Sequence, residues 1–151
     1  MNLKDLLSQG KLRRHKTSKK EIENLVAIVN RDIKDAKVED LSSDRRFACA
    51  YNAVLQLATV ILYCSGYKPQ GTGHHFTVFQ TMKIIMGNDY KELVDYFDSC
   101  RSKRNITDYD YAGTISNSEV EELISEAESF LESTLDWLKK NCTVANLRTK
   151  L

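Results

Sequence analysis

One short segment of the chain concentrates side chains that could grip a phosphate. Residues 101–111 hold two arginines, a lysine, an asparagine and two tyrosines. An arginine offers two parallel N–H donors to a phosphate, and a phenol ring can stack on a nucleobase. An asparagine amide or a phenol can complete the set of donors. The segment therefore predicts an anion site, whose candidate residues are Arg101, Lys103, Arg104, Asn105, Tyr109 and Tyr111.

A helix end would account for part of the same segment without any ligand. Arg101 and Arg104 are three residues apart, near the point where a helical pattern breaks off, so they share one face of that helix. Cations are favoured near a helix C-terminus by the helix dipole. On this alternative the two arginines only stabilise the helix.

Two adjacent histidines form a second candidate site. His74 and His75 follow a glycine-rich loop at 67–73. Neighbouring residues on a helix point about 100° apart, which makes them a poor pair of metal ligands. Either one of them caps the helix while the other is packed or solvated, or one enters the cleft beside the arginines. His15, in a basic linker, is interpreted as a surface group.

The composition describes a globular chain without a dominant charge. Its 151 residues carry a net charge of +1, so any affinity for nucleic acid must come from local patches. Basic residues concentrate in 1–20 and acidic ones in 116–140. We interpret these segments as complementary solvated faces or, alternatively, the first as a basic arm that approaches RNA or DNA.

Cysteine spacing and hydropathy point to a chain without a metal centre or a membrane segment. The four cysteines are too widely spaced for a zinc motif, and we expect neither a metal nor a cofactor. The longest apolar run, 53–64, is short and is interrupted by Gln56 and Thr59. We expect a cytoplasmic protein with reduced thiols and no membrane partner.

Helical periodicity predicts the elements that must position these residues. The patterns Ser18–Glu21 and Ser118–Glu121 are typical of capping boxes at helix starts. No run alternates with the period of a strand. We expect helices at 2–9, 18–38, 43–65, 74–86, 88–105 and 118–140.

These elements predict an all-α fold in a single domain over residues 1–151. The arrangement expected is an antiparallel up-and-down bundle of four long helices with one or two short ones. Residues 1–17 form a short helix and a basic linker in this scheme, and residues 141–151 form a frayed tail.

The helix expected at 43–65 is apolar on nearly every face, which is typical of a central, buried helix. Tyr51 is expected to pack in the core with its hydroxyl satisfied. Asn52 would face the fifth helix and could orient Arg104. Arg45 and Arg46, at the helix start, are solvated or pair with an acid of the last helix; alternatively they extend a basic rim around the cleft.

The arginine segment resembles the signature of HEPN domains (higher eukaryotes and prokaryotes nucleotide-binding), a family of helical bundles. Their hallmark is an arginine, usually followed by a polar residue such as asparagine, with a histidine four to six residues further on. Some toxin members add a tyrosine two residues after the histidine. Arg104, Asn105 and Tyr111 match this pattern, and Tyr109 stands where the histidine is usual. Residues 47–56, 66–69 and 73–75 resemble the second and third bundle segments of a HEPN subgroup.

This resemblance implies a function, partners and site residues. HEPN toxins are metal-independent ribonucleases that act as homodimers, in which the ribose 2′-hydroxyl attacks the adjacent phosphorus. The arginine stabilises the phosphoryl charge and the histidine moves protons. By this resemblance Arg104 and Tyr109 are the candidate catalytic residues. Other members are non-catalytic, or pair with a nucleotidyltransferase antitoxin that adds AMP to the motif tyrosine, here Tyr111.

The tyrosine at 109 weighs against catalysis. A free phenol has a pKa of about 10 and is a poor general base at pH 7. Asp108 could act as a base, although it would also repel a phosphate. The sequence thus favours RNA or nucleotide binding, with a toxin-type ribonuclease, a partner of a nucleotidyltransferase and a structural or regulatory dimer as alternatives. Accessory candidates are Asn52, His74, His75 and Asp108.

Overall fold

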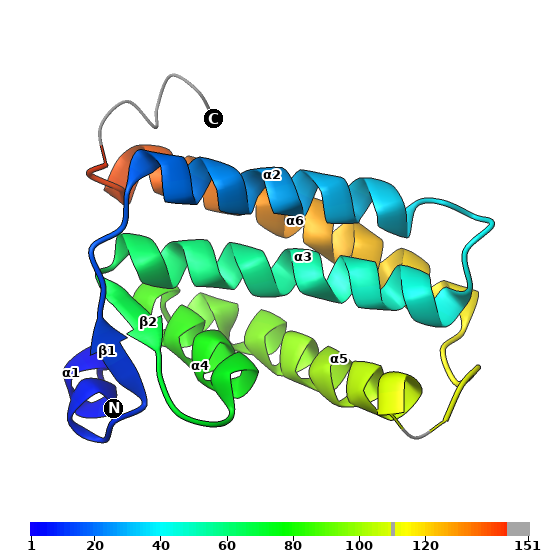
Figure 1. The fold of residues 1–151 in the computed structure, drawn as a ribbon, viewed down its shortest axis with the longest axis horizontal. Helices are drawn as coiled ribbons and strands as arrows, with labels where there is room; N and C mark the ends of the chain where they lie inside the picture. Colours follow the sequence, from blue (N-terminus) through cyan, green and yellow to red (C-terminus); the bar gives the residue numbers. More distant parts are fainter. Residues whose placement is uncertain (110, 145–151) are drawn as a thin grey trace.

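A computed structural model describes residues 1–109 and 111–144, without the side chain of Tyr109. Helices dominate these residues (Figure 1). The prediction of an all-α chain is confirmed. The elements are α1 (Leu3–Ser8), β1 (Leu12–Arg14), α2 (Lys19–Ala36), α3 (Ser43–Cys64), β2 (Tyr67–Pro69), α4 (His74–Met86), a 3-10 turn η1 (Asn88–Tyr90), α5 (Lys91–Tyr109) and α6 (Asn117–Asn141).

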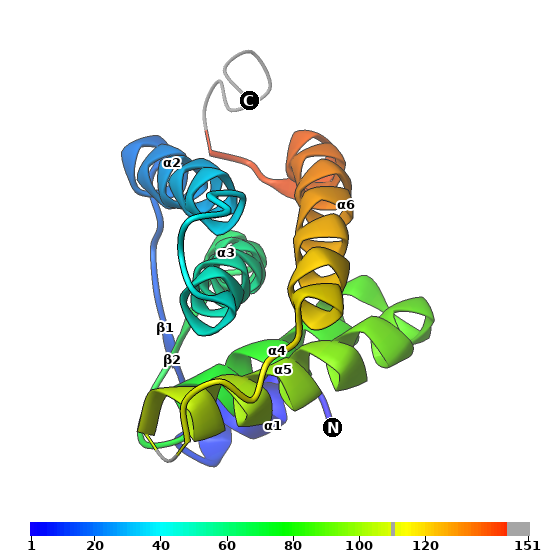
Figure 2. The same cartoon turned by 90° about the vertical axis from the view of Figure 1, so that its right-hand side faces the viewer.

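The helix α3 lies at the centre of the fold. It runs antiparallel to α2 and also contacts α4, α5 and α6 (Figure 1). Viewed along the bundle, α2 and α3 lie side by side, α6 stands next to them, and α4 and α5 lie across the remaining side (Figure 2). The predicted central helix is therefore in its expected place, and it separates α2 from the α4–α5 pair.

A string of aromatic rings fixes α4 and α5 against the rest of the bundle. Tyr51 of α3 meets Phe79 of α4 with ring centroids 6.0 Å apart, and Phe79 meets Phe97 of α5 at 5.8 Å. Phe97 in turn lies 5.4 Å from Phe130 of α6. Tilted aromatic pairs at such distances add to the free energy gained by burial. The string links α3, α4, α5 and α6, and it fixes how the neighbouring residues of α4 and α5 are placed relative to each other.

The apolar character of α3 reflects its burial. Among the described helices, α3 is long and apolar enough to pass a length-and-composition test for a membrane span, and 61% of the tested window is buried inside the fold. A core helix surrounded by four others needs apolar residues on every face. Packing within the chain therefore accounts for its hydropathy.

A small antiparallel sheet joins the N-terminal segment to the loop before α4. Arg13 pairs with Lys68, and Leu12, fully buried, pairs with Pro69. Strands of three residues are too short to show the alternation by which a strand is recognised in a sequence. The prediction of a linker at 11–17 missed β1 for this reason.

His15 follows β1 and is not the surface group that was expected. Its Nε2 bonds to the carboxylate of Glu21, and its ring lies 4.7 Å from that of Tyr63. The Ser18 hydroxyl accepts the Glu21 amide as a helix cap, as predicted. The Glu21 carboxylate does not close the expected capping box, since it binds His15 and the Thr17 hydroxyl.

The last helix is capped by Ser116 rather than by the predicted Ser118. Ser116 and Glu119 form a reciprocal capping box, so α6 starts at Asn117 and the Ser118–Glu121 pattern lies inside it. At the other end, Cys142 is buried rather than frayed. The rest of the predicted tail, from residue 145, lies outside the described residues.

The ion pairs of the acidic residues of α6 are formed with basic residues outside the basic segment 1–20. Arg46, buried in α3, donates to Glu121 at 2.8 Å and to the Ala36 carbonyl at 2.7 Å, which confirms the predicted pair between the core helix and the last helix. Lys37 and Lys103 pair with Glu128 and Glu119. Among the described residues, α6 thus forms ion pairs with the C-terminal end of α2, with α3 and with α5.

Candidate anion site on α4 and α5

The arginine segment lies within a helix rather than beyond its end. α5 continues through Tyr109, so the expected break near Arg104 was wrong. Residues three or four apart on a helix are neighbours, and the side chains of α5 pair accordingly. Arg101 donates from Nε to Asp98 at 2.9 Å, and Arg104 contacts Asp108 at 3.4 Å. The two arginines are thus flanked by two carboxylates along one stripe of α5.

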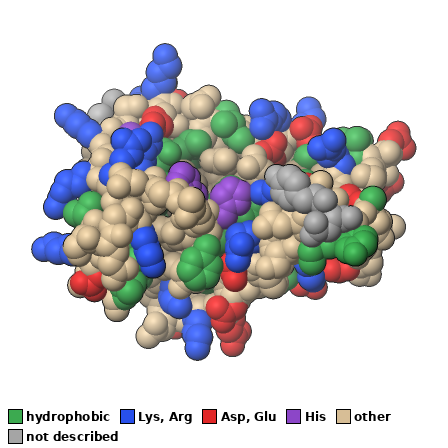
Figure 3. All heavy atoms as spheres, turned by 60° about the horizontal axis from the view of Figure 1, so that its bottom comes forward, with side chains coloured by type: hydrophobic (Ala, Val, Ile, Leu, Met, Phe, Trp, Pro, Cys, Tyr) green, Lys and Arg blue, Asp and Glu red, His purple; other side chains and the backbone are tan. Residues whose placement is uncertain are grey.

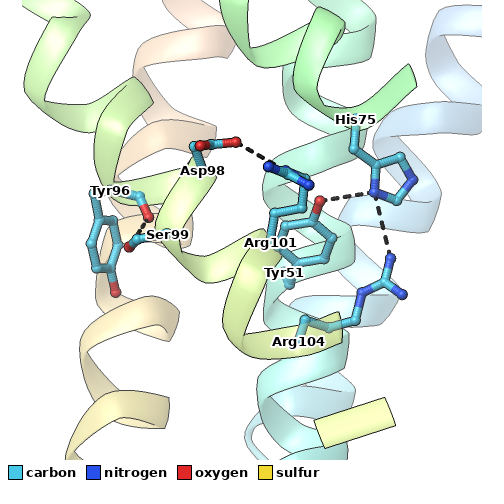
Figure 4. Close-up of polar contacts among 7 residues, drawn as sticks. All are labelled: Tyr51, His75, Tyr96, Asp98, Ser99, Arg101 and Arg104. Atoms are coloured by element: carbon cyan, nitrogen blue, oxygen red, sulfur yellow. Dashed lines mark hydrogen bonds and ion pairs between the residues drawn. The ribbon is translucent and has the colours of Figure 1, made fainter. Parts of the chain in front are cut away.

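Arg104 is held loosely by polar groups and closely by an aromatic face. Its guanidinium lies over the ring of Tyr51, with the central carbon 5.1 Å from the ring centroid. The polar contacts, Nη1 to Asp108 at 3.4 Å and Nη2 to His75 Nδ1 at 3.5 Å, are at the outer limit for hydrogen bonds (Figure 4). The side chain is 17% exposed. Among the described residues, both of these contacts are long, so the N–H donors of Arg104 are only weakly engaged.

His75 joins α4 to this arginine through its Nδ1 atom. The Tyr51 hydroxyl lies 2.9 Å from the same Nδ1 (Figure 4). A guanidinium can only donate, so its position beside Nδ1 favours the tautomer in which Nδ1 accepts and Nε2 carries the proton. The Tyr51 hydroxyl then donates to Nδ1. The arrangement leaves the Nε2–H of His75 as a donor for a ligand.

Two pKa shifts agree with this assignment. Burial lowers the pKa of His75, and the charges of Arg104 and Arg101 lower it further. Burial raises the pKa of Tyr51 well above its usual range, although the two arginines oppose that rise. Near neutral pH the imidazole is thus neutral and the phenol keeps its proton, as the hydrogen bond between them requires.

Arg101 occupies a position beside an exposed phenylalanine. Its guanidinium lies 5.8 Å from the ring centroid of Phe76, the residue after His75 on α4. Phe76 is 45% exposed although the three residues that follow it are buried. The face therefore combines two guanidiniums, an imidazole and an open aromatic ring.

The other predicted site residues are dispersed. Asn52 does not orient Arg104: its amide donates to Asp32 of α2, and its oxygen accepts from Gln56 at 3.4 Å. The reason is that its side of α3 faces α2. Lys103 pairs with Glu119 of α6 at 2.9 Å. Asn105 is partly buried, one position round the helix from Arg104.

The two tyrosines of the motif lie at the last residue of α5 and just beyond it. Tyr111 is 70% exposed, and its backbone N–H bonds the carbonyl of Ile106. Tyr109 is the last residue of α5, five positions after Arg104, and its side chain lies outside the described residues. Five positions on a helix correspond to about 140° round its axis, so the two residues are on different faces.

One histidine of the pair lies beside the arginines and the other is exposed to solvent. His75 reaches the arginine cluster, whereas His74 is exposed. Neither caps α4, because the N-cap is Gly73, in a left-handed conformation, without a side-chain hydrogen bond. Tyr51 is buried with a satisfied hydroxyl, as predicted, and it is also the platform for Arg104. Sequence reasoning missed Phe76 and Asp98 as neighbours of the site; the only signal was their spacing from His75 and Arg101.

The face that carries the cluster is rich in cations. Figure 3 shows histidine side chains at its centre, with Lys and Arg side chains beside them and a larger group at the end of the molecule that carries α1 and β1. Within the described part of the chain, no three His, Cys, Asp or Glu residues are placed to hold a metal ion. The chain matches no family model, and neither the curated proteins nor the solved structures provide a match.

Proposed function

We propose that the face formed by His75, Arg101 and Arg104 binds a phosphate of RNA or of a nucleotide. The observation that carries this proposal is the state of Arg104. Its guanidinium is oriented by the Tyr51 ring, yet its polar contacts with the described residues are 3.4 and 3.5 Å long, so its N–H donors are only weakly engaged. A phosphate can accept two of these donors in parallel.

The neighbouring groups support the same ligand class. The Nε2–H of His75 adds a donor, and Arg101 adds charge although Asp98 already occupies its Nε. Asp108 competes with the ligand for Arg104, but at 3.4 Å and exposed to solvent it holds the guanidinium weakly. An anion therefore gains more at Arg104 than it displaces.

Binding is favoured over cleavage by the tautomer of His75. A general base must present an unprotonated nitrogen to the hydroxyl that it activates. In the tautomer that the contact with Arg104 favours, Nδ1 of His75 accepts from Tyr51 and Nε2 carries the proton, so the imidazole is a donor toward the ligand. A toxin-type ribonuclease remains the alternative activity, in which Tyr109 stands at the usual histidine position and Arg104 stabilises the phosphoryl charge.

The resemblance to HEPN domains supports this proposal and adds a homodimer to it. In that family two arginine motifs face each other across a cleft, so two copies of the site would bind one RNA strand. The test is fluorescence anisotropy of a labelled single-stranded RNA of a dozen or so nucleotides, at two salt concentrations, in EDTA. We expect binding that weakens with salt and an RNA that is intact on a denaturing gel. Absence of binding at low salt would overturn the proposal.

A second function is favoured by the exposure of Tyr111. A phenol that is 70% exposed, on a connection between α5 and α6, is open to modification by another protein. We propose, as the alternative, that this chain pairs with a nucleotidyltransferase antitoxin that transfers AMP to Tyr111. Coexpression with such an enzyme should add one AMP to the protein by mass spectrometry, and Tyr111→Phe should prevent it.

A further inference from the structure

We infer that the cavity between α4 and the N-terminal segment receives a nucleobase of the ligand whose phosphate Arg104 binds. This inference rests on the proposed function and adds a second subsite to it. The cavity has a volume of about 310 Å³, which is at the small end of the range for ligand sites. Its walls are mostly apolar and include Leu6, Lys11, Phe76, Gln80, Lys83 and Ile84.

Phe76 joins the cavity to the phosphate site. It belongs to the cavity wall, and it also carries the guanidinium of Arg101 at 5.8 Å from its ring centroid. The preceding residue, His75, contacts Arg104. One turn of α5 thus separates the two arginines, and one step along α4 separates the imidazole from the ring. The cavity wall and the phosphate site therefore use neighbouring residues of α4.

Packing within the fold does not explain why an aromatic residue stands at position 76, because much of its side chain is exposed to solvent. Val78 and Phe79, on the same helix, are buried, whereas Phe76 leaves 45% of its surface in solvent. Burying an aromatic ring is favourable, so an open ring beside a cation is a place where a flat partner gains free energy. A nucleobase stacks on such a ring whatever its identity.

Polar groups at the cavity suit a base attached to an anionic backbone. Gln80 and Lys83 follow Phe76 by four and seven positions and share its face of α4. The Gln80 amide can both donate to and accept from a base edge. Lys11 and Lys83 are the charged residues of the wall, and no carboxylate is among its described lining residues. Their charge complements phosphates on either side of the bound base.

The test compares two RNA strands of equal length, one normal and one with abasic residues at every position. Anisotropy is measured for the unmodified protein, Phe76→Leu and Phe76→Tyr. We expect the unmodified protein to prefer the normal strand by about tenfold, the size of one stacked base. Phe76→Leu should remove the preference for the normal strand, and Phe76→Tyr should retain it. A strand with one 2-aminopurine should lose fluorescence on binding to the unmodified protein and not to Phe76→Leu.

The outcomes separate this inference from the proposed function. If neither strand binds, the phosphate site and the base subsite both fail. Equal affinity for the two strands, unchanged by Phe76→Leu, would overturn the base subsite and leave the phosphate site standing. Decanoate that binds with the same dependence on Phe76, without competing with RNA, would show that the cavity takes an acyl chain and would also overturn the inference.

Discussion

Replacing Arg104 by alanine should abolish RNA binding and barely change the stability of the fold. The contact that Arg104 makes with Asp108 is 3.4 Å long and solvent-screened, which is worth about 0.3–0.5 kcal/mol for such a pair. Its position over the Tyr51 ring is worth about 0.5–1 kcal/mol. The total, about 1 kcal/mol, corresponds to a fall of about 2–4 °C in Tm for a chain of this size.

The loss in binding should be much larger. A phosphate that accepts two N–H donors from Arg104 gains two charge-assisted hydrogen bonds, each worth about 1.5–3 kcal/mol. Alanine removes both, so the Kd should rise at least about 100-fold. Arg104→Lys keeps the charge but not the paired donors, and it should bind with intermediate affinity.

Thermal melting by circular dichroism and RNA binding by anisotropy test these two magnitudes together. Arg31→Ala is the matched control, because it removes one exposed arginine from α2, a helix that does not pack against α5. It should lower affinity only slightly. A fall in Tm of more than about 10 °C for Arg104→Ala, with affinity unchanged, would refute the reasoning and make Arg104 a structural residue.

Three further predictions concern the residues around the arginine. Burial and two guanidiniums lower the pKa of His75, so its neutral form stabilises the fold above about pH 6.5, and that contribution is lost as pH falls through the lowered pKa. In His75→Gln the free energy of unfolding in urea should therefore change less between pH 7 and pH 5 than in the unmodified protein. An unchanged pH profile would contradict the shift. Asp108→Asn removes the competitor for Arg104, so RNA affinity should rise about two- to fivefold in the anisotropy assay; a weaker complex would mean that Asp108 orients the guanidinium. On the toxin-type alternative, Tyr109→His places an imidazole at the usual motif position and should produce RNA cleavage in EDTA on a gel, whereas intact RNA would count against a latent ribonuclease site.

Sequence periodicity located the helices but not all of their ends. The predicted bounds of α4 were correct because Gly73 and Gly87 flank it. The cap of α6 was misplaced because Ser116–Glu119 and Ser118–Glu121 carry the same pattern. Only packing distinguishes two equivalent caps, and here the Ser116 box is the one that forms, with Glu119 also paired to Lys103.

Only the part of the candidate site that is continuous in sequence could be predicted. The cations of α5 are adjacent in sequence, so their composition alone marked Arg101 and Arg104. Their partner His75 is 29 positions earlier than Arg104, and which histidine of the pair would reach α5 depended on how Phe79 packs α4 against Tyr51 of α3. Asn52 was assigned to the wrong neighbour because a helix that is apolar all round gives no sequence signal of which face meets α2.

Charge balance along α5 explains how a binding site can exist on a chain with almost no net charge. Asp98 and Asp108 flank Arg101 and Arg104, so the stripe is neutral when no anion is bound. Asp98 holds Arg101 at 2.9 Å, whereas Asp108 holds Arg104 only at 3.4 Å. The phosphate that we propose would replace the weaker of the two partners and leave the stronger in place. On this proposal, the affinity of the face for an anion depends on that difference between two contacts rather than on the total charge.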